Sequence, residues 1–507
     1  MRPRLVALAA LAFVSRLPQL LSPNLLVDGD ESVLGLMAKH FAAGREVPLF
    51  FWGQRYGFST VEAGLAAAAF KIAGVGPLPL KLAMLALWTV GVLFLFLALA
   101  RMIGERRAFW TIAVLILTPA WAVWSMKARG GYLTAFTASA ALLWILVQPR
   151  ERDTVSRWLA AGALTAIVWL AHPIWLPGLA PFIAFALASR RRWMPPAIYA
   201  ATTAAIVVAI KAIPVTSSPT WAGPALGNPS IWGTRVRVAQ QIYISLTGSY
   251  YLMTPVDPPG PVTPAVAWFW CATIALLAVV QIHRVATRRY SRWSHLLFAA
   301  MATTLVANWL LLFARDGRYL LPLSALVVTL AAVEMDRLPR RAVTTITAVL
   351  VAAGAVSLVE FRNFAYLWTN APNSLSESRR MQQVINAVTS RGVTHVFTMN
   401  GLLDTQLIFY SDERVIARST DATERYQPYV DAVTHALADG EPVAVVGYAN
   451  TSGAPGCWDV PICTGDIEHL VRDPERIFTV DGKYFVYVGA DAPLLRRLGF
   501  DLPPALR

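Results

Sequence analysis

The sequence predicts a polytopic α-helical membrane protein with about eleven transmembrane helices, followed by a C-terminal extracytoplasmic α/β domain. Of its 507 residues, 56% are hydrophobic and only 15% are charged, whereas soluble domains carry about 25% charged residues. Apolar segments of roughly 15 to 25 residues, long enough to cross a bilayer, recur up to about residue 360. From about residue 373, short apolar runs alternate with amphipathic segments. These observations separate a membrane domain, residues 1–360, from an α/β domain, residues 373–507.

The expected spans begin close to the N-terminus. The first one, "LVALAALAF" after "MRPR", resembles a signal peptide, but Arg16 interrupts it and no small-x-small cleavage site follows. We therefore expect an uncleaved first helix. The eleven apolar segments are 5–21, 79–100, 108–125, 131–147, 158–171, 173–188, 195–213, 264–282, 294–313, 318–335 and 342–359.

The distribution of Lys and Arg predicts the orientation. With the N-terminus in the cytoplasm, the inner segments carry 18 Lys and Arg, whereas the short outer turns carry only Lys127, Arg129 and Arg315. This asymmetry is typical of the bacterial cytoplasmic membrane, where cations stay inside. The net charge of +14 is thus explained by topology, and we expect no nucleic-acid partner. An odd number of spans places the C-terminal domain outside, together with two long outer loops, 22–78 and 214–263.

Both outer loops and the C-terminal domain have predicted elements. "ESVLGLMAKHFAAG" predicts a helix along the membrane surface, and "FSTVEAGLAAAAFKIAG" a second surface helix or a re-entrant piece. "RVRVAQQIYISLTGSYYL" predicts an interfacial helix. In the C-terminal domain, "HVFTMN", "RVIARS", "PVAVVGYA" and "YFVYVGA" predict strands, with helices in "SESRRMQQVINAVTSRG" and "ATERYQPYVDAVTHALADG". Cys457 and Cys463 could form a disulfide outside the cytoplasm or remain two thiols.

Three acids, Asp28, Asp30 and Glu31, lie within four positions at the start of the first outer loop. One interpretation is structural: Asp30 caps the following helix, and acids favour a first turn. That accounts for one carboxylate better than for three. The alternative is catalytic: a carboxylate at the membrane surface takes a proton from an acceptor hydroxyl or amine.

Five cations fall at outer helix ends, where cations are otherwise disfavoured. Such residues can neutralise a phosphate, Arg bidentately and Lys as a point charge, and so stabilise a phosphate leaving group. The alternative is contact with lipid headgroups or pairing with Asp316. The five are Arg55, Lys127, Arg129, Arg315 and Arg318.

Five further residues accompany these motifs as candidate substrate contacts. Tyr56, Tyr132 and Tyr319 could stack on a sugar, or belong to an interfacial aromatic belt. His172 lies at an outer helix end before a proline, where a histidine is more often a packing or capping residue than a ligand. Glu62 lies among apolar residues, where an acid indicates a site.

In combination, these motifs resemble the GT-C superfamily of integral-membrane glycosyltransferases, of the bacterial protein O-mannosyltransferase and lipid A aminoarabinose transferase type. The resemblance covers roughly residues 1–335 and depends on motif order. It is carried by "DGDESVLGLMAKHFAAG", "FFWGQRYGFSTVEAGLAAAAFKIAG", "WSMKARGGYLTAF", "WLAHPIWLPGLAPF" and "RDGRYLLPLSAL".

The resemblance implies transfer of a sugar from a polyprenyl-phosphate-linked donor to an extracytoplasmic glycan, lipid or protein. It implies Asp30 as the catalytic base, Glu31 as its support or as a contact to the acceptor, and Arg318 and Tyr319 as contacts to the lipid phosphate; Asp28 is a local addition to the acidic pair. "KARGG" has cations where several relatives have a second acid, so no cofactor is indicated and a divalent metal stays open. A transporter of lipid-linked sugars and a non-catalytic envelope assembly factor are the alternatives.

Overall fold

The computed structural model describes most of the chain. The described residues are 1–22, 25, 27–149, 154–189, 193–213, 238–251, 254–255, 258–289, 291–312, 317–363, 377–399, 401–420, 424–448, 471, 473–482 and 484–506. Arg315, Cys457 and Cys463 lie outside these ranges, so the predictions for them are not addressed by the structure.

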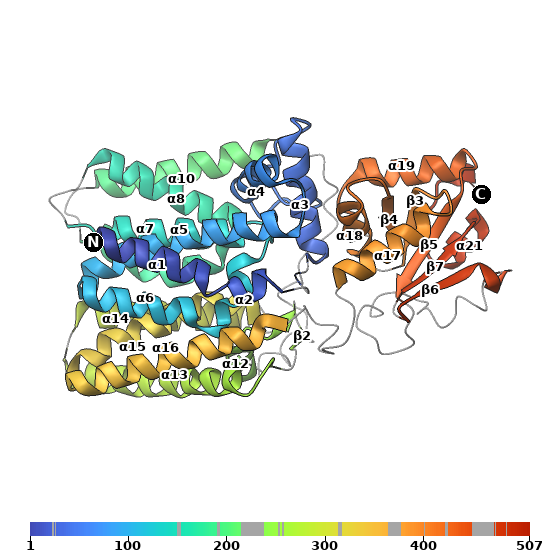
Figure 1. The fold of residues 1–507 in the computed structure, drawn as a ribbon. Helices are drawn as coiled ribbons and strands as arrows, with labels where there is room; N and C mark the ends of the chain where they lie inside the picture. The colour runs from blue at the N-terminus through green and yellow to red at the C-terminus, as the bar shows by residue number, and fades with distance from the viewer. Residues whose placement is uncertain are drawn as a thin grey trace.

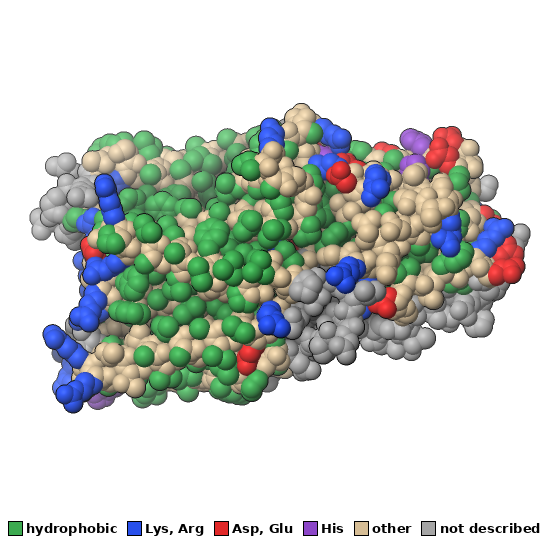
Figure 2. All heavy atoms as spheres, in the orientation of Figure 1, with side chains coloured by type: hydrophobic (Ala, Val, Ile, Leu, Met, Phe, Trp, Pro, Cys, Tyr) green, Lys and Arg blue, Asp and Glu red, His purple; other side chains and the backbone are tan. Residues whose placement is uncertain are grey.

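The first 360 residues form a bundle of helices that run side by side (Figure 1). Hydrophobic side chains cover the visible flank of the bundle, and Lys and Arg gather at the end that carries the N-terminus (Figure 2). At that end, Arg4 donates a hydrogen bond to Glu105 at 2.5 Å. The bundle helices are α1 (Arg2–Val14), α2 (Leu17–Leu20), α5 (Pro77–Ile103), α6 (Glu105–Leu117), α7 (Tyr132–Leu146), α8 (Val155–Ala171), α9 (Leu176–Ala188), α10 (Met194–Ala212), α12 (Val238–Thr247), α13 (Val262–Ala286), α14 (Arg292–Ala307), α15 (Leu321–Glu334) and α16 (Arg340–Glu360).

Every predicted apolar segment contains a helix, but the helices differ in length. Among the described residues, five are long and apolar enough to cross a membrane: Pro77–Ile103, Met194–Ala212, Val262–Ala286, Gly317–Glu334 and Arg340–Glu360. Glu105–Leu117 and Pro119–Met126 make a sixth candidate, bent by 63°. Three further apolar helices are shorter: Tyr132–Leu146, Val155–Ala171 and Pro173–Ala188.

Two helices of the first outer loop, α3 (Gly29–Ala42) and α4 (Thr60–Ala73), lie at the opposite end of the bundle from the N-terminus (Figure 1). Eleven of the fourteen α3 residues are buried. The sequence predicted a helix lying along the membrane surface. Instead, the C-terminal domain packs on the side of α3 that faces away from the bundle, so α3 is enclosed between the two domains.

The C-terminal domain is a five-stranded mixed sheet with helices. The strand order is β4-β3-β5-β7-β6; β3 pairs in parallel with β4 and β5, whereas β7 is antiparallel to β5 and β6. Each predicted strand segment contains a strand, while β6, α18 and α21 were not predicted. The elements are α17 (Glu377–Thr389), β3 (His395–Thr398), α18 (Leu403–Tyr410), β4 (Ile416–Ser419), α19 (Gln427–Ala438), β5 (Val443–Tyr448), β6 (Ile477–Val480), β7 (Tyr484–Val488) and α21 (Ala492–Arg497). A two-residue pair, β1 (Tyr250–Tyr251) with β2 (Thr254–Pro255), lies in the bundle's other outer segment.

Candidate active site

Asp28 caps helix α3. Its carboxylate accepts a hydrogen bond from the backbone N–H of Glu31 at 2.9 Å, and the Glu31 side chain accepts one from the backbone N–H of Asp28 at 3.2 Å. This is a complete capping box. The structural interpretation of the sequence named Asp30 as the cap, and that assignment is wrong. Lys127 also pairs with Asp28; burial raises the pKa of the Asp28 carboxyl, but Lys127 and Arg129 lower it by more.

Glu31 is fully buried and engaged on several sides. Lys81 of α5 pairs with its Oε1, the backbone N–H of Ala128 donates to the same oxygen at 3.0 Å, and Lys127 Nζ lies 3.9 Å from Oε2. A buried carboxylate needs such partners, since an unpaired charge in the interior is very costly. The geometry therefore makes Glu31 a structural acid that ties α3 to α5 and to the segment before α7.

Asp30 differs from its two neighbours because its partners are guanidinium groups. Arg129 Nη2 lies 2.6 Å from Asp30 Oδ2, and Arg425 Nη2 lies 3.5 Å from Oδ1. Arg425 belongs to the C-terminal domain, two residues before α19. Asp30 therefore lies where the two domains meet, and it is the acid of the cluster whose side chain takes no part in the capping box.

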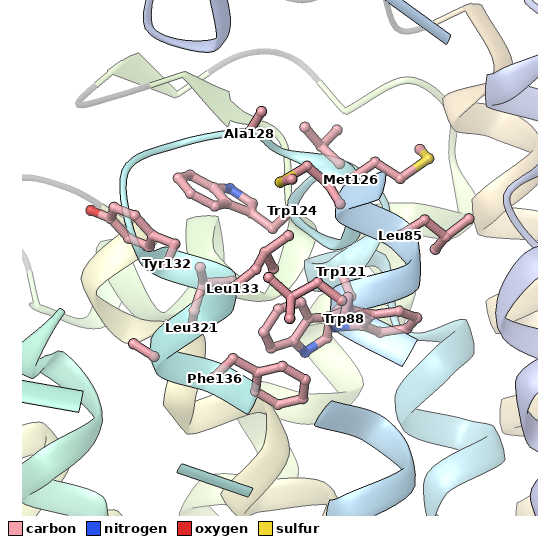
Figure 3. Close-up of a cluster of buried hydrophobic side chains, with 14 of the residues drawn as sticks. Leu85, Trp88, Trp121, Trp124, Met126, Ala128, Tyr132, Leu133, Phe136 and Leu321 are labelled. Carbon is pink, nitrogen blue, oxygen red and sulfur yellow. The ribbon is translucent and has the colours of Figure 1, made fainter. Parts of the chain in front are cut away.

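The segment that carries Lys127 and Arg129 is anchored by a cluster of buried aromatic and aliphatic side chains (Figure 3). Trp121 packs against Trp88 and Phe136, with ring centroids 5.8 and 4.9 Å apart, and Trp124 packs against Tyr132 at 5.0 Å. Closely packed aromatic groups resist displacement. The cluster therefore fixes the position of the cations that follow Trp124.

Glu62 anchors the same segment from α4. Its carboxylate accepts hydrogen bonds from the backbone N–H groups of Gly131, Leu133 and Thr134 at 3.0–3.1 Å. These are N–H groups at the first turn of α7, so Glu62 caps that helix from outside. Its side chain is fully buried. Glu62 thus holds the first turn of α7 in position, and its predicted contact with substrate stays a prediction.

Four more predicted residues gather beside Arg129. The rings of Tyr132 and His172 lie 4.0 Å apart, and His172 and Tyr319 lie 6.1 Å apart. The Arg318 guanidinium lies 5.0 Å from the Tyr319 ring centre and 6.0 Å from that of Tyr132. These side chains come from α7, the end of α8 and the turn before α15, so three distant segments meet here.

Electrostatic effects link this group to the acids. Burial lowers the pKa of Arg129, Asp30 raises it and the nearby Arg318 lowers it, with a net upward shift. Burial raises the pKa of Tyr56, and Arg425 and Arg318 are among the charges that act on it. Tyr56 is 39% exposed. Charges of both domains therefore act on Tyr56, and its side chain is partly open to solvent.

Two residues predicted to contact phosphate, Lys127 and Arg55, have other surroundings in the structure. Lys127 is 2% exposed and points to Asp28 and Glu31, so it binds the acids of the chain itself. Arg55 has an exposed side chain, and its carbonyl accepts a hydrogen bond from Lys211. The structure brings Asp28, Asp30, Glu31, Tyr56, Lys127, Arg129, Tyr132, His172, Arg318 and Tyr319 to one end of the bundle, leaves the Arg55 side chain outside, and does not describe Arg315.

Lys81 and Arg425 were missed by sequence reasoning. Lys81 had a signal, because it is a single cation inside an apolar span, where a charged residue indicates a buried partner. Arg425 had no such signal in the sequence, since its partner Asp30 lies 395 positions earlier in the chain.

An apolar cavity opens within the bundle next to the aromatic group. Phe136, Trp175 and Pro322 line it, together with Leu95, Phe182 and Leu326 from neighbouring helices. Phe136 lies one turn after Tyr132, Trp175 follows His172, and Pro322 follows Tyr319. Three of the residues that line the cavity thus lie about one helical turn from a residue of the polar site.

Among the described residues, no group of three or more His, Cys, Asp or Glu side chains is arranged to hold a metal ion. The three acids of the site are each paired with Lys or Arg.

Comparisons with known proteins support the fold but not a close relationship. No protein-family model and no curated protein sequence matches the chain. Among solved structures, ArnT from Cupriavidus metallidurans bound to undecaprenyl phosphate is similar, with a TM-score of 0.60 and 14% identity over 96% of this chain and 98% of that one. The Archaeoglobus fulgidus oligosaccharyltransferase with Zn and sulfate has a TM-score of 0.54 and 13% identity, over 87% and 68%.

The oligosaccharyltransferase AglB from Archaeoglobus fulgidus, in complex with an inhibitory peptide and a dolichol-phosphate, has a TM-score of 0.52 at 14% identity, over 88% and 69%. All of these are GT-C glycosyltransferases, so the resemblance seen in the sequence is confirmed at the level of the fold. The chain has the GT-C fold of integral-membrane glycosyltransferases.

Proposed function

We propose that the chain is a membrane glycosyltransferase that moves a sugar from a polyprenyl-phosphate-linked donor to an acceptor outside the cytoplasm. One observation carries the proposal. A buried acid, Asp30, lies at the junction of the two domains with Arg129 beside it, Arg318 near Arg129, and Tyr319 in contact with Arg318. An acid that is not used in a helix cap, with guanidinium groups close by, is what proton removal at a phosphate-linked centre requires.

The reaction proceeds by one displacement in this proposal. Asp30 accepts the proton of the acceptor hydroxyl or amine while that atom bonds to the anomeric carbon. The bond from the anomeric carbon to the phosphate oxygen breaks, and polyprenyl phosphate leaves as a dianion. Arg129 and Arg318 balance the charge that develops on the phosphate, and Tyr56 and Tyr132 offer rings on which the sugar can stack.

The apolar cavity offers a place for the polyprenyl chain. Its walls begin at Phe136, Trp175 and Pro322, next to the proposed phosphate contacts. A phosphate at Arg318 would therefore have an apolar cavity directly beside it for the attached isoprene units, whose burial there is favourable. The similar ArnT structure contains undecaprenyl phosphate and the AglB structure a dolichol-phosphate, and we extend that ligand class to this chain.

We propose the bacterial cytoplasmic membrane as the location, with the N-terminus inside and the C-terminal domain outside. The Lys and Arg at the N-terminal end of the bundle support this orientation (Figure 2). Membrane lipids and an extracytoplasmic glycan, lipid or protein acceptor are then the remaining partners.

We further propose that the reaction needs no divalent metal. The carboxylates that could bind one are paired with Lys81, Lys127 and Arg129, and cations supply the positive charge that a metal would provide. Turnover should therefore be unchanged after chelation with EDTA; loss of turnover that Mg²⁺, Mn²⁺ or Zn²⁺ restores would refute this part.

The test of the function is donor cleavage by membranes that contain the full chain. A panel of labelled undecaprenyl-phosphate-linked pentoses and hexoses should yield free undecaprenyl phosphate. Asp30→Asn should abolish that release and still bind undecaprenyl phosphate, because it removes the base and keeps the size of the side chain. Asp439→Asn is the matched control, since Asp439 is exposed at the end of α19.

Two results would contradict the proposal. Normal release by Asp30→Asn would remove Asp30 as the base. Passage of intact lipid-linked sugar across vesicles, without cleavage of any donor in the panel, would indicate a transporter instead.

A further inference from the structure

We propose that Arg425 makes the C-terminal domain part of the donor site, as a direct ligand of the lipid phosphate. The inference depends on the proposed function and extends it: the phosphate site would be built across the domain interface, with Arg129 and Arg318 from the bundle and Arg425 from the α/β domain.

The position of Arg425 is closely defined. Its guanidinium lies over the Phe51 ring, 5.4 Å from the centre, and Nη2 reaches toward Asp30 at 3.5 Å. Gly53 has a φ of +74°, and a Cβ there would come within 3.2 Å of Arg425 Cδ. Glycine at 53 thus permits both the turn and the close approach of the arginine.

Arg425 and Arg129 both have hydrogen-bonding capacity to spare. Arg425 Nε and Arg129 Nη1 are buried and have no hydrogen-bond partner among the described residues. Buried donors are nearly always satisfied by protein, water or ligand. Both groups belong to guanidiniums that converge on Asp30, so one anion beside that carboxylate could accept from both.

The charges of the site also favour an anion. Within the described residues, three carboxylates (Asp28, Asp30 and Glu31) face five cations: Lys81, Lys127, Arg129, Arg318 and Arg425. The excess is two positive charges, in a region where charges are poorly screened. A phosphomonoester dianion, the product left on the lipid, matches that excess. Without Arg425 the excess is one.

The domain interface holds Arg425 in place. Tyr426, the next residue, stacks on Trp52 with ring centroids 4.2 Å apart. Tyr429 donates to Glu413 at 2.8 Å, and His40 Nε2 lies 3.1 Å from Glu413 Oε1. Because these contacts lie on both sides of Arg425 along the chain, the guanidinium is positioned before any ligand arrives, which lowers the entropy cost of binding.

The experiment measures binding of undecaprenyl phosphate, the lipid alone, to the full chain in nanodiscs. Arg425→Gln should weaken binding about tenfold or more, the usual effect of losing a hydrogen bond to a charged group. Arg425→Lys should recover part of the affinity. The control is Arg476→Gln, which makes the same charge change in the same domain, at an exposed arginine near β6, the sheet edge opposite β4.

Hydrogen exchange of α3, measured on the same samples, separates ligand binding from domain docking. We expect α3 to remain protected in Arg425→Gln. Unchanged lipid binding in Arg425→Gln, equal losses in Arg425→Gln and Arg476→Gln, or loss of binding together with loss of α3 protection would each overturn the assignment. Absence of lipid binding by the wild-type chain would count against the proposed function itself.

Discussion

Gly35→Ala should loosen the contact between α3 and the C-terminal domain. A Cβ at position 35 would lie 2.8 Å from Cδ2 of Phe409, with two further ring atoms of Phe409 also too close. Phe409 is 4% exposed and its ring is flanked by Phe70 and Tyr410, with centroids 6.5 and 5.6 Å away. The ring cannot turn aside without disturbing both neighbours, so the added methyl group must separate α3 from α18.

The size of the effect follows from overpacking. Extra methyl groups in a well-packed interior cost about 1–3 kcal/mol, which corresponds to roughly a 5- to 150-fold change in an equilibrium. Native-state hydrogen exchange measures such local opening. In nanodiscs, the amides of α3 and α18 should therefore exchange about 5- to 150-fold faster in Gly35→Ala than in the wild type.

Two further variants make this result specific. Gly76→Ala is the control, because a Cβ at position 76 would meet only Pro79 Cδ, at 4.0 Å, and exchange of α3 should not change. Adding Phe409→Leu to Gly35→Ala should restore much of the lost protection by vacating the space. Wild-type exchange rates in Gly35→Ala would refute the reasoning, as would a double variant that exchanges as fast as the single one.

Three other expectations concern the interface, the buried ion pair and the cavity. Burial lowers the pKa of His40, but hydrogen bonds to Glu413 and Glu46 raise it by more, so the net shift is upward. The stabilisation that His40 gives to domain docking is therefore complete below about pH 6.5. It is lost as the pH rises through the raised pKa. Protection of α3 should fall over that range in the wild type and not in His40→Gln. Lys81→Met should destabilise the chain by about 3 kcal/mol, because it removes the closest cation of the buried Glu31 carboxylate. Adding Glu31→Gln should recover part of the loss in unfolding midpoint, measured in detergent. Ser139 lines the cavity, so Ser139→Leu should fill it. Binding of undecaprenyl phosphate should weaken roughly tenfold, the effect of keeping about two methylene groups out of the apolar site. Binding of geranyl phosphate should not change.

Sequence reasoning was most successful where the signal was local. The apolar segments, the acid cluster and the strands of the C-terminal domain each depend on neighbouring residues, and each has a counterpart in the structure. The span count was less well determined. Helices α7, α8 and α9 have only 15, 17 and 13 residues. They are short because helices end or begin at the outer end of the bundle, where glycine and proline residues lie next to the site residues.

The features that could not be predicted from the sequence depend on contacts between segments that are distant in the chain. The surroundings of α3 could not be predicted, because its second covering layer comes from α18, about 370 positions later: Thr405 donates to the carbonyl of Gly29 and Gln406 to that of Val27. The pairing of Lys127 with Asp28 was missed for the same reason. Outer cations looked like free phosphate ligands in sequence, but one of them neutralises the acids of the chain itself.

The positions of the three acids around helix α3 explain why their roles differ. Asp28 and Glu31 are three positions apart and share one side of the helix, where each accepts a hydrogen bond from the backbone of the other. The spacing Asp-x-x-Glu is itself a capping signal, and it identifies Asp28 as the cap. Asp30 is two positions from Asp28, and residues two apart do not face each other on a helix. The cap thus leaves Asp30 free to meet Arg129 and Arg425, at the junction between bundle and C-terminal domain. A proton acceptor is needed at that junction if the donor lies in the bundle and the acceptor arrives from outside.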